Sequence, residues 1–161
     1  MKRCLILSCD LSIYESDILF DIVQRHTDHD NTLYYTQTNV YPLDFKLQWQ
    51  HVGVVDNIDV DYVRENIGMF DVIVTLNDIV VSVFNDLSEL DLVDESLHGI
   101  YDLLERDGRF IIGDVKNLTL QYLNGVYDEC VKHSAFGYDY YEFKKIPLFD
   151  DIVTELGMLL I

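Results

Sequence analysis

Two apolar runs joined by an amphipathic stretch constrain the fold of this chain more than any other feature. The first run is FDVIVTL at 70–76, and the second centres on FII at 110–112. Between them, at 90–104, apolar residues recur every three or four positions, the spacing of a helix that buries one side. Arg106 and Gly108 predict where this helix ends. Apolar strands joined by a helix are typical of a parallel sheet covered by helices.

Strands and helices alternate along the rest of the chain as well. Ser12 and Glu15 form a capping box, which begins a helix with apolar residues between Ile18 and Val23. We expect further strands at 4–8, 32–38, 47–55 and 138–146, and further helices at 60–67 and from Asn117. The segment 152–161 is either a closing strand or a short helix followed by a strand. The connection between the last two strands is too short for a parallel crossover, so they should pair antiparallel. The sequence predicts one α/β domain over 1–161, a three-layer, Rossmann-like, mostly parallel sheet with an antiparallel C-terminal strand pair.

The charge balance restricts the kinds of partner that this chain can bind. With 11 basic and 29 acidic residues, the formal net charge is −18, which repels phosphate backbones and anionic lipid. We therefore expect no direct binding to nucleic acid or to a membrane surface. Two interpretations of the acidity stay open. It provides either a solvated surface that aids solubility or an acidic face for a basic protein partner, which could itself bind nucleic acid.

Nothing in the sequence predicts a membrane span or a secretory signal. There is no apolar run of 18 residues, and Asp10 interrupts the short apolar stretch near the start without a cleavage site after it. We therefore expect a cytoplasmic protein. Ala135 is the only alanine, while aspartate, tyrosine, isoleucine and valine are abundant. We interpret this bias as a hint of viral coding, on which no other inference depends.

Three cysteines without paired spacing predict reduced thiols rather than a disulfide framework. Cys9, at the carboxyl end of the first strand, is either a nucleophile at a helix start or a small buried thiol. The second interpretation is favoured, because no arginine stands at the spacing of a phosphatase loop. We expect Cys4 and Cys130 in the core. Cys130 would complete a helical stripe with Leu118, Tyr122 and Val126.

One polar loop contains several residue types that bind metals. His26, Asp28, His29 and Asp30 offer imidazole and carboxylate groups, which suit zinc or manganese. A hydrated turn is the commoner role for such a loop, and no distant motif such as a histidine-glutamate helix pair accompanies it. We therefore expect no metal site.

Tyrosines fall into two groups that could form an interaction surface. The groups are Tyr34, Tyr35 and Tyr41, and Tyr138, Tyr140 and Tyr141. Core packing is the commoner explanation for tyrosines in strands, and it stays open beside the surface interpretation. An exposed terminal strand could also serve as the edge of a homodimer.

The order of strands and helices resembles the class I S-adenosylmethionine-dependent methyltransferase fold over nearly the whole chain from Arg3. The segment 70–78 looks like the fourth strand of that family, and 103–112 looks like the approach to its fifth strand. The resemblance implies S-adenosylmethionine as the cofactor. It also implies that ligands bind at the carboxyl edge of the sheet.

The resemblance assigns candidate residues to the cofactor. Cys9 and Asp10 would lie in the first loop, and Asp56 and Asn57 after the third strand would read the adenine. The family has a glycine-rich turn after the first strand, so that backbone can approach the methionine moiety. Here 8–13 contains no glycine.

Two further positions bear on the cofactor and the substrate. Where the family holds the ribose with an acid after the second strand, this chain has Gln37 and Asn39, and its first acid is Asp44. Asn77 and Asp78 would face the substrate as the candidate catalytic residues. In the ribose 2′-O-methyltransferase branch, three members of a catalytic tetrad resemble Asp78, Lys116 and Glu142.

Two hypotheses of function follow. In the first, which we favour, the fold has lost cofactor chemistry and acts as a binding or regulatory protein through its acidic and tyrosine-rich surfaces. In the second, the chain is an active methyltransferase on a small molecule or a basic protein. Methyl transfer from a sulfonium needs positioning more than a strong base, so the second hypothesis does not require an obvious catalytic acid or base.

Overall fold

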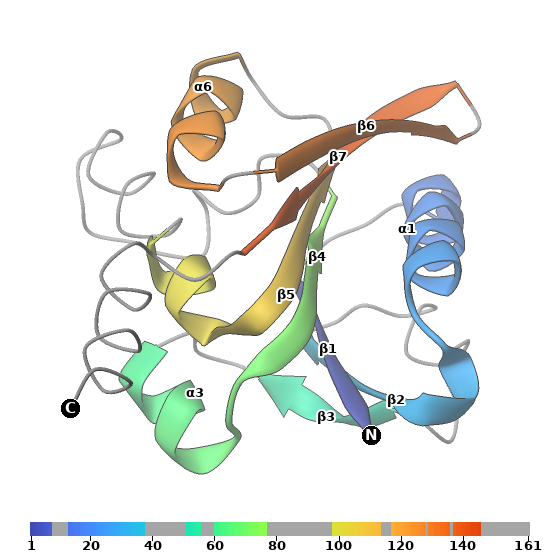
Figure 1. The fold of residues 1–161 in the computed structure, drawn as a ribbon. Helices are drawn as coiled ribbons and strands as arrows, with labels where there is room; N and C mark the ends of the chain where they lie inside the picture. Colours follow the sequence, from blue (N-terminus) through green and yellow to red (C-terminus); the bar gives the residue numbers. More distant parts are fainter. Residues whose placement is uncertain are drawn as a thin grey trace, which may run out of the picture.

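The computed structural model describes residues 1–7, 13–37, 51–55, 60–76, 98–113, 117–127, 129–135 and 137–145. These residues form a seven-stranded sheet in the order β3-β2-β1-β4-β5-β7-β6 (Figure 1). The strands are β1 (Lys2–Leu7), β2 (Thr32–Gln37), β3 (His51–Val55), β4 (Phe70–Thr75), β5 (Leu104–Gly113), β6 (Glu129–Ala135) and β7 (Tyr138–Lys144). The helices are α1 (Ile13–His26), α3 (Val60–Asn66) and α6 (Asn117–Val126), with a 3-10 turn at His29–Asn31 and helical turns at 98–103.

The strands from β3 to β5 are parallel, as predicted. β1 lies between β2 and β4, with Leu5 opposite Tyr35 on one side and Ile73 on the other. A strand in this position is covered on both faces, so every side chain must tolerate burial. Accordingly, 4–7 and 72–76 are buried throughout. The continuous apolar runs of the sequence therefore correspond to the centre of the sheet, and the predicted fold class is confirmed.

Helices cover both faces of the sheet and create two cores, which gives the three predicted layers (Figure 1). On one face, α1 packs its apolar side, including Ile18, Leu19 and Ile22, against β1, β4 and β5. On the other face, α3, 98–103 and α6 pack against the same strands. None of the helices that the structure describes combines the length and the apolar character needed to span a membrane.

The antiparallel strand pair differs from the prediction in one member. β7 confirms the strand predicted at 138–146, and it pairs antiparallel with β5. Its second partner is β6, through a tight hairpin closed at Gly137, which has a φ of 71°. The sequence predicted 152–161 as that partner, but β7 already has neighbours on both sides. The predicted strand 152–161 lies outside the described residues.

The helix before β5 ends earlier than predicted. Helical turns stop at Leu103, and β5 begins at Leu104, before the expected cap at Gly108. Asp107, with a φ of 63°, has the left-handed conformation that was expected of the glycine. Gly108 is needed for space, because a Cβ there would lie 2.7 Å from the backbone oxygen of Glu105.

The tyrosines that the structure describes belong mostly to the core. Tyr34 and Tyr140 are buried, and Tyr35, Tyr138 and Tyr141 are partly buried against the two cores. These five residues therefore follow the core-packing interpretation, because strands covered by helices turn the rings inward. Tyr41 lies outside the described residues.

The two cysteines that the structure describes differ in burial. Cys4 is in the core, as predicted. The prediction for Cys130 is wrong, because α6 ends at Val126 and Cys130 is exposed on β6.

Candidate functional site

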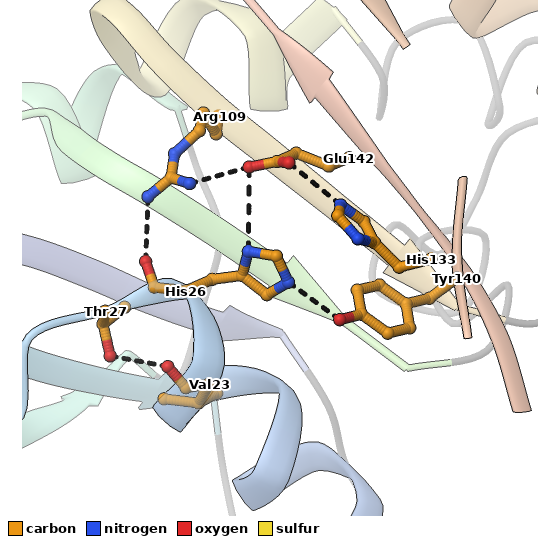
Figure 2. A network of polar contacts seen from close by, with 7 residues as sticks. All are labelled: Val23, His26, Thr27, Arg109, His133, Tyr140 and Glu142. Atoms are coloured by element: carbon orange, nitrogen blue, oxygen red, sulfur yellow. Dashed lines mark hydrogen bonds and ion pairs between the residues drawn. The ribbon is translucent and has the colours of Figure 1, made fainter. Parts of the chain in front are cut away.

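Five polar side chains meet where the end of α1 contacts the β6–β7 hairpin (Figure 2). We call His26, Arg109, His133, Tyr140 and Glu142 the Glu142 cluster. His26 is the last residue of α1, and Arg109 is on β5. His133 on β6 stands opposite Tyr140 on β7, and Glu142 follows two residues later on the same face. The register of the hairpin thus presents three side chains to the end of one helix.

Glu142 is the centre of this cluster. Its Oε2 accepts a hydrogen bond from Arg109 Nη1 at 2.7 Å, and its Oε1 accepts one from His133 Nε2 at 3.0 Å. His26 Nδ1 lies 3.7 Å from Oε2. Burial alone would raise the pKa of Glu142, but the hydrogen bonds from His133 and Arg109 and the charge of Arg109 outweigh it and lower the pKa. Glu142 is therefore an anion at neutral pH.

His26 is held from both sides of its ring. Burial lowers the pKa of His26, against the opposing effect of Glu142, and the charges of His133 and Arg109 lower it further. The imidazole is therefore neutral at pH 7. Its Nε2 lies 2.8 Å from the Tyr140 hydroxyl, and the ring packs edge-on to both Tyr140 and His133. Burial also raises the pKa of Tyr140, which keeps its proton.

Arg109 links the cluster to the end of α1. Its Nη2 donates a hydrogen bond to the backbone oxygen of His26 at 2.8 Å. A cation there satisfies a free carbonyl and complements the negative end of the helix dipole. Thr27 ends the helix in a similar way, because its hydroxyl donates to the oxygen of Val23 at 2.6 Å (Figure 2).

A pocket of about 290 Å³ opens beside the cluster at the amino ends of the strands. His26 and Arg109 line it together with Lys2 and Asp71, and Lys2 Nζ lies 3.7 Å from the Asp71 carboxylate. The remaining walls include Arg3, Thr27, Asp28, Thr32, Val72, Arg106 and Asp107. Its charges are of both signs, and it is at the opposite edge of the sheet from the expected cofactor site.

The site residues predicted from the sequence lie outside the described residues. These are Cys9 and Asp10, Asp56 and Asn57, and Asn77 and Asp78. They remain predictions. Of the tetrad-like residues, only Glu142 is described, and it contacts Arg109 and the two histidines of the cluster.

The polar loop after α1 acts as a turn, as its commoner interpretation predicted. Asp28 accepts hydrogen bonds from Asp30 N at 3.2 Å and from Asn31 Nδ2 at 2.7 Å. The His29 ring lies against Tyr34. Only His26 of the suspected ligands turns to the Glu142 cluster, where it meets partners that sequence spacing did not reveal.

Comparison with known proteins defines the fold class. No family model matches the sequence, and no curated protein matches it. Among solved structures, it is similar to the N-methyltransferase NodS from Bradyrhizobium japonicum, with 12% identity, a TM-score of 0.56, and coverage of 91% of this chain and 86% of that chain. Human methyltransferase-like protein 13, solved with SAH, gives 15% identity, a TM-score of 0.55, and coverage of 95% and 78%.

The chain therefore has the class I S-adenosylmethionine-dependent methyltransferase fold. The same fold also matches the spermidine synthase from Thermotoga maritima at 17% identity and a TM-score of 0.53, covering 93% of this chain and 56% of that one. Identities this low show the fold alone, and proteins named for different reactions share it.

Proposed function

We propose that this chain is a non-catalytic binding or regulatory protein built on the methyltransferase fold, with an acidic surface that engages a basic protein partner. The connection between β1 and α1 carries this proposal. It consists of five residues, 8–12, and none is glycine. A side chain at every position of so short a connection opposes the close backbone approach that the resemblance requires for the methionine moiety.

The end of β2 supports the same conclusion. Gln37 is the last residue of β2, and the first acidic residue after it is Asp44. A carboxylate can accept hydrogen bonds from both ribose hydroxyls, whereas an amide offers a single oxygen and no charge. The chain thus departs from the family at two of its three cofactor positions.

The distribution of charge supports a basic partner. The segments that follow the carboxyl ends of the five parallel strands are 8–12, 38–50, 56–59, 77–97 and 114–116. Together they contain eleven acidic residues and two basic ones, Lys46 and Lys116. Ligands of open α/β sheets bind at this edge, so the partner expected there is cationic.

A second candidate function is an active S-adenosylmethionine-dependent methyltransferase on a small molecule or a basic protein. One observation favours it: Asp56 and Asn57 directly follow Val55, the last residue of β3, at the position that would read the adenine. Asn77 and Asp78 follow β4 within three residues and would face the substrate.

Calorimetric titration with S-adenosylmethionine and S-adenosylhomocysteine distinguishes the two functions. We expect no binding at millimolar cofactor and no rise in melting temperature, since a ligand that binds only the native state must stabilise it. Micromolar binding that is lost in Asp56→Ala, but kept in the neighbouring Asp59→Ala, would establish the enzyme and end our proposal.

The partner is tested separately with fluorescent peptides of matched length, one lysine-rich and one glutamate-rich. We expect the protein to bind only the lysine-rich peptide, with an affinity that falls as salt rises. Replacing Asp86 with lysine should weaken binding more than the same single change at Glu129, which is exposed on β6. An equal loss of affinity in the two variants would mean that the peptide is attracted by the net charge and not by a defined surface.

A further inference from the structure

We propose that His26, His133 and Glu142 form a binding site for a divalent transition-metal ion of the zinc type, at the contact between α1 and the β6–β7 hairpin. The three residues offer two imidazole nitrogens and one carboxylate oxygen, which is a donor set that zinc accepts. Their ligand atoms all lie within 4.8 Å of one another. The candidate cofactor residues Cys9, Asp10, Asp56 and Asn57 are not among these three ligands, so the inference does not rest on the cofactor question.

The spacing of the ligand atoms fits a single ion. Zinc is bound at about 2.0–2.2 Å by nitrogen and oxygen, so two ligands on one ion lie roughly 3–4 Å apart. His133 Nε2 is 3.0 Å from Glu142 Oε1, which is already this spacing. His26 Nδ1 is 3.7 Å from the other carboxylate oxygen, Oε2, so its ring must turn toward an ion that is held by Oε1. An ion can therefore take the place of the proton between His133 and Glu142, with small rotations of the rings.

Neighbouring groups already orient the ligands. A metal-binding histidine usually donates its other ring N–H to a nearby acceptor, which fixes the ring. With His26 Nδ1 on the ion, Nε2–H points to the Tyr140 oxygen 2.8 Å away. Arg109 holds Glu142 Oε2, which leaves Oε1 beside His133 as the ligand oxygen (Figure 2).

Burial favours a site that is formed in advance but still accessible. The His26 and Glu142 side chains are 10% and 15% exposed, and that of His133 is 29% exposed, which gives the ion a route of entry. Three protein ligands leave the fourth position of a tetrahedral ion for water or a ligand. Because Arg109 already neutralises the carboxylate, we expect weaker affinity than that of a structural zinc site.

The matched variants are His133→Gln and His29→Gln, which remove one imidazole each. His133 belongs to the site, whereas His29 lies three residues after His26 and outside the cluster. Competition with a chromogenic chelator should show one equivalent of Zn²⁺ on the full chain. We expect His133→Gln to weaken the affinity at least about tenfold, and His29→Gln to leave it unchanged. Mg²⁺ should not compete, because it prefers oxygen ligands.

A second measurement needs no variant. Co²⁺ in the wild-type site should give the visible absorption of an ion with nitrogen and oxygen ligands in low coordination, and Zn²⁺ should remove it. The inference is overturned by the absence of binding up to millimolar Zn²⁺. It is also overturned by binding that His133→Gln and His29→Gln weaken equally, since that would place the ion on the acidic surface.

Discussion

Replacing Arg109 with methionine tests the role of the Glu142 cluster in holding α1 against the sheet. The change keeps the aliphatic bulk and removes two hydrogen bonds, to Glu142 Oε2 at 2.7 Å and to the His26 oxygen at 2.8 Å. Hydrogen bonds to charged groups contribute about 1.5–3 kcal/mol each, and removing one partner of a buried ion pair costs about 3–5 kcal/mol. Because Arg109 is 35% exposed, solvent screens part of this loss. We expect a loss of roughly 2–3 kcal/mol in the free energy of unfolding.

A double-mutant cycle with Glu142→Gln isolates the interaction between the two side chains. The measurement is urea denaturation followed by circular dichroism, with a chelator present so that no metal contributes. We expect a coupling energy of about 1–2 kcal/mol, and a fall in melting temperature of roughly 4–12 °C for Arg109→Met alone.

Arg25→Met is the matched control. Arg25 contacts Asp21 at 2.8 Å on the outside of α1, where Arg25 is 51% exposed. Such a pair contributes only about 0.3–0.5 kcal/mol. A coupling energy for Arg109 and Glu142 below about 0.5 kcal/mol, no larger than this control pair, would refute the reasoning.

Three further predictions concern acid stability, glycines and thiols. The pKa of Glu142 is lower in the folded protein than its usual value of 4.5. The ionised Glu142 should therefore stabilise the fold fully above pH 4.5, and this stabilisation should be lost as the pH falls below that value. The coupling energy between Arg109 and Glu142, measured across pH, checks this. Gly68 has a φ of 111°, so Gly68→Ala should lower the free energy of unfolding by about 1–2 kcal/mol. Gly125 lies in α6 with no atom near a new Cβ, so Gly125→Ala should raise the free energy of unfolding by about 0.5 kcal/mol. Destabilisation by both glycine changes would contradict this account. Iodoacetamide should modify exposed Cys130 in the native protein and spare Cys4, whose pKa burial raises well above its usual range, as read by peptide mass spectrometry. Modification of Cys4 in the native protein would contradict this prediction, because it would show that the core around Cys4 is accessible to the reagent.

The parallel strands were predictable because their burial leaves a signature within each short segment of sequence. Strands buried on both faces must be apolar throughout, and β1 and β4 therefore appear as unbroken apolar runs. β6 has no such signature, since ECVKHSA is mostly exposed along one edge. Cys130 continues the helical spacing of α6, so the sequence pattern could not reveal that the helix ends at Val126.

The Glu142 cluster could not be predicted for a different reason. His26 and Tyr140 are 114 residues apart and meet only because β7 joins β5 in a register that turns Tyr140 and Glu142 to the end of α1. No spacing of residues in the sequence predicts the contact between His26 and these β7 side chains. Two signals were present, a histidine at a helix end and a glutamate inside a tyrosine-rich strand, but only the fold brings them together.

Calorimetric titration with S-adenosylmethionine tests the central claim most directly. The glycine-free connection after β1 predicts no heat of binding at millimolar cofactor. Micromolar binding that is sensitive to Asp56→Ala would contradict that claim, and would show that the methyltransferase fold of this chain retains its cofactor site.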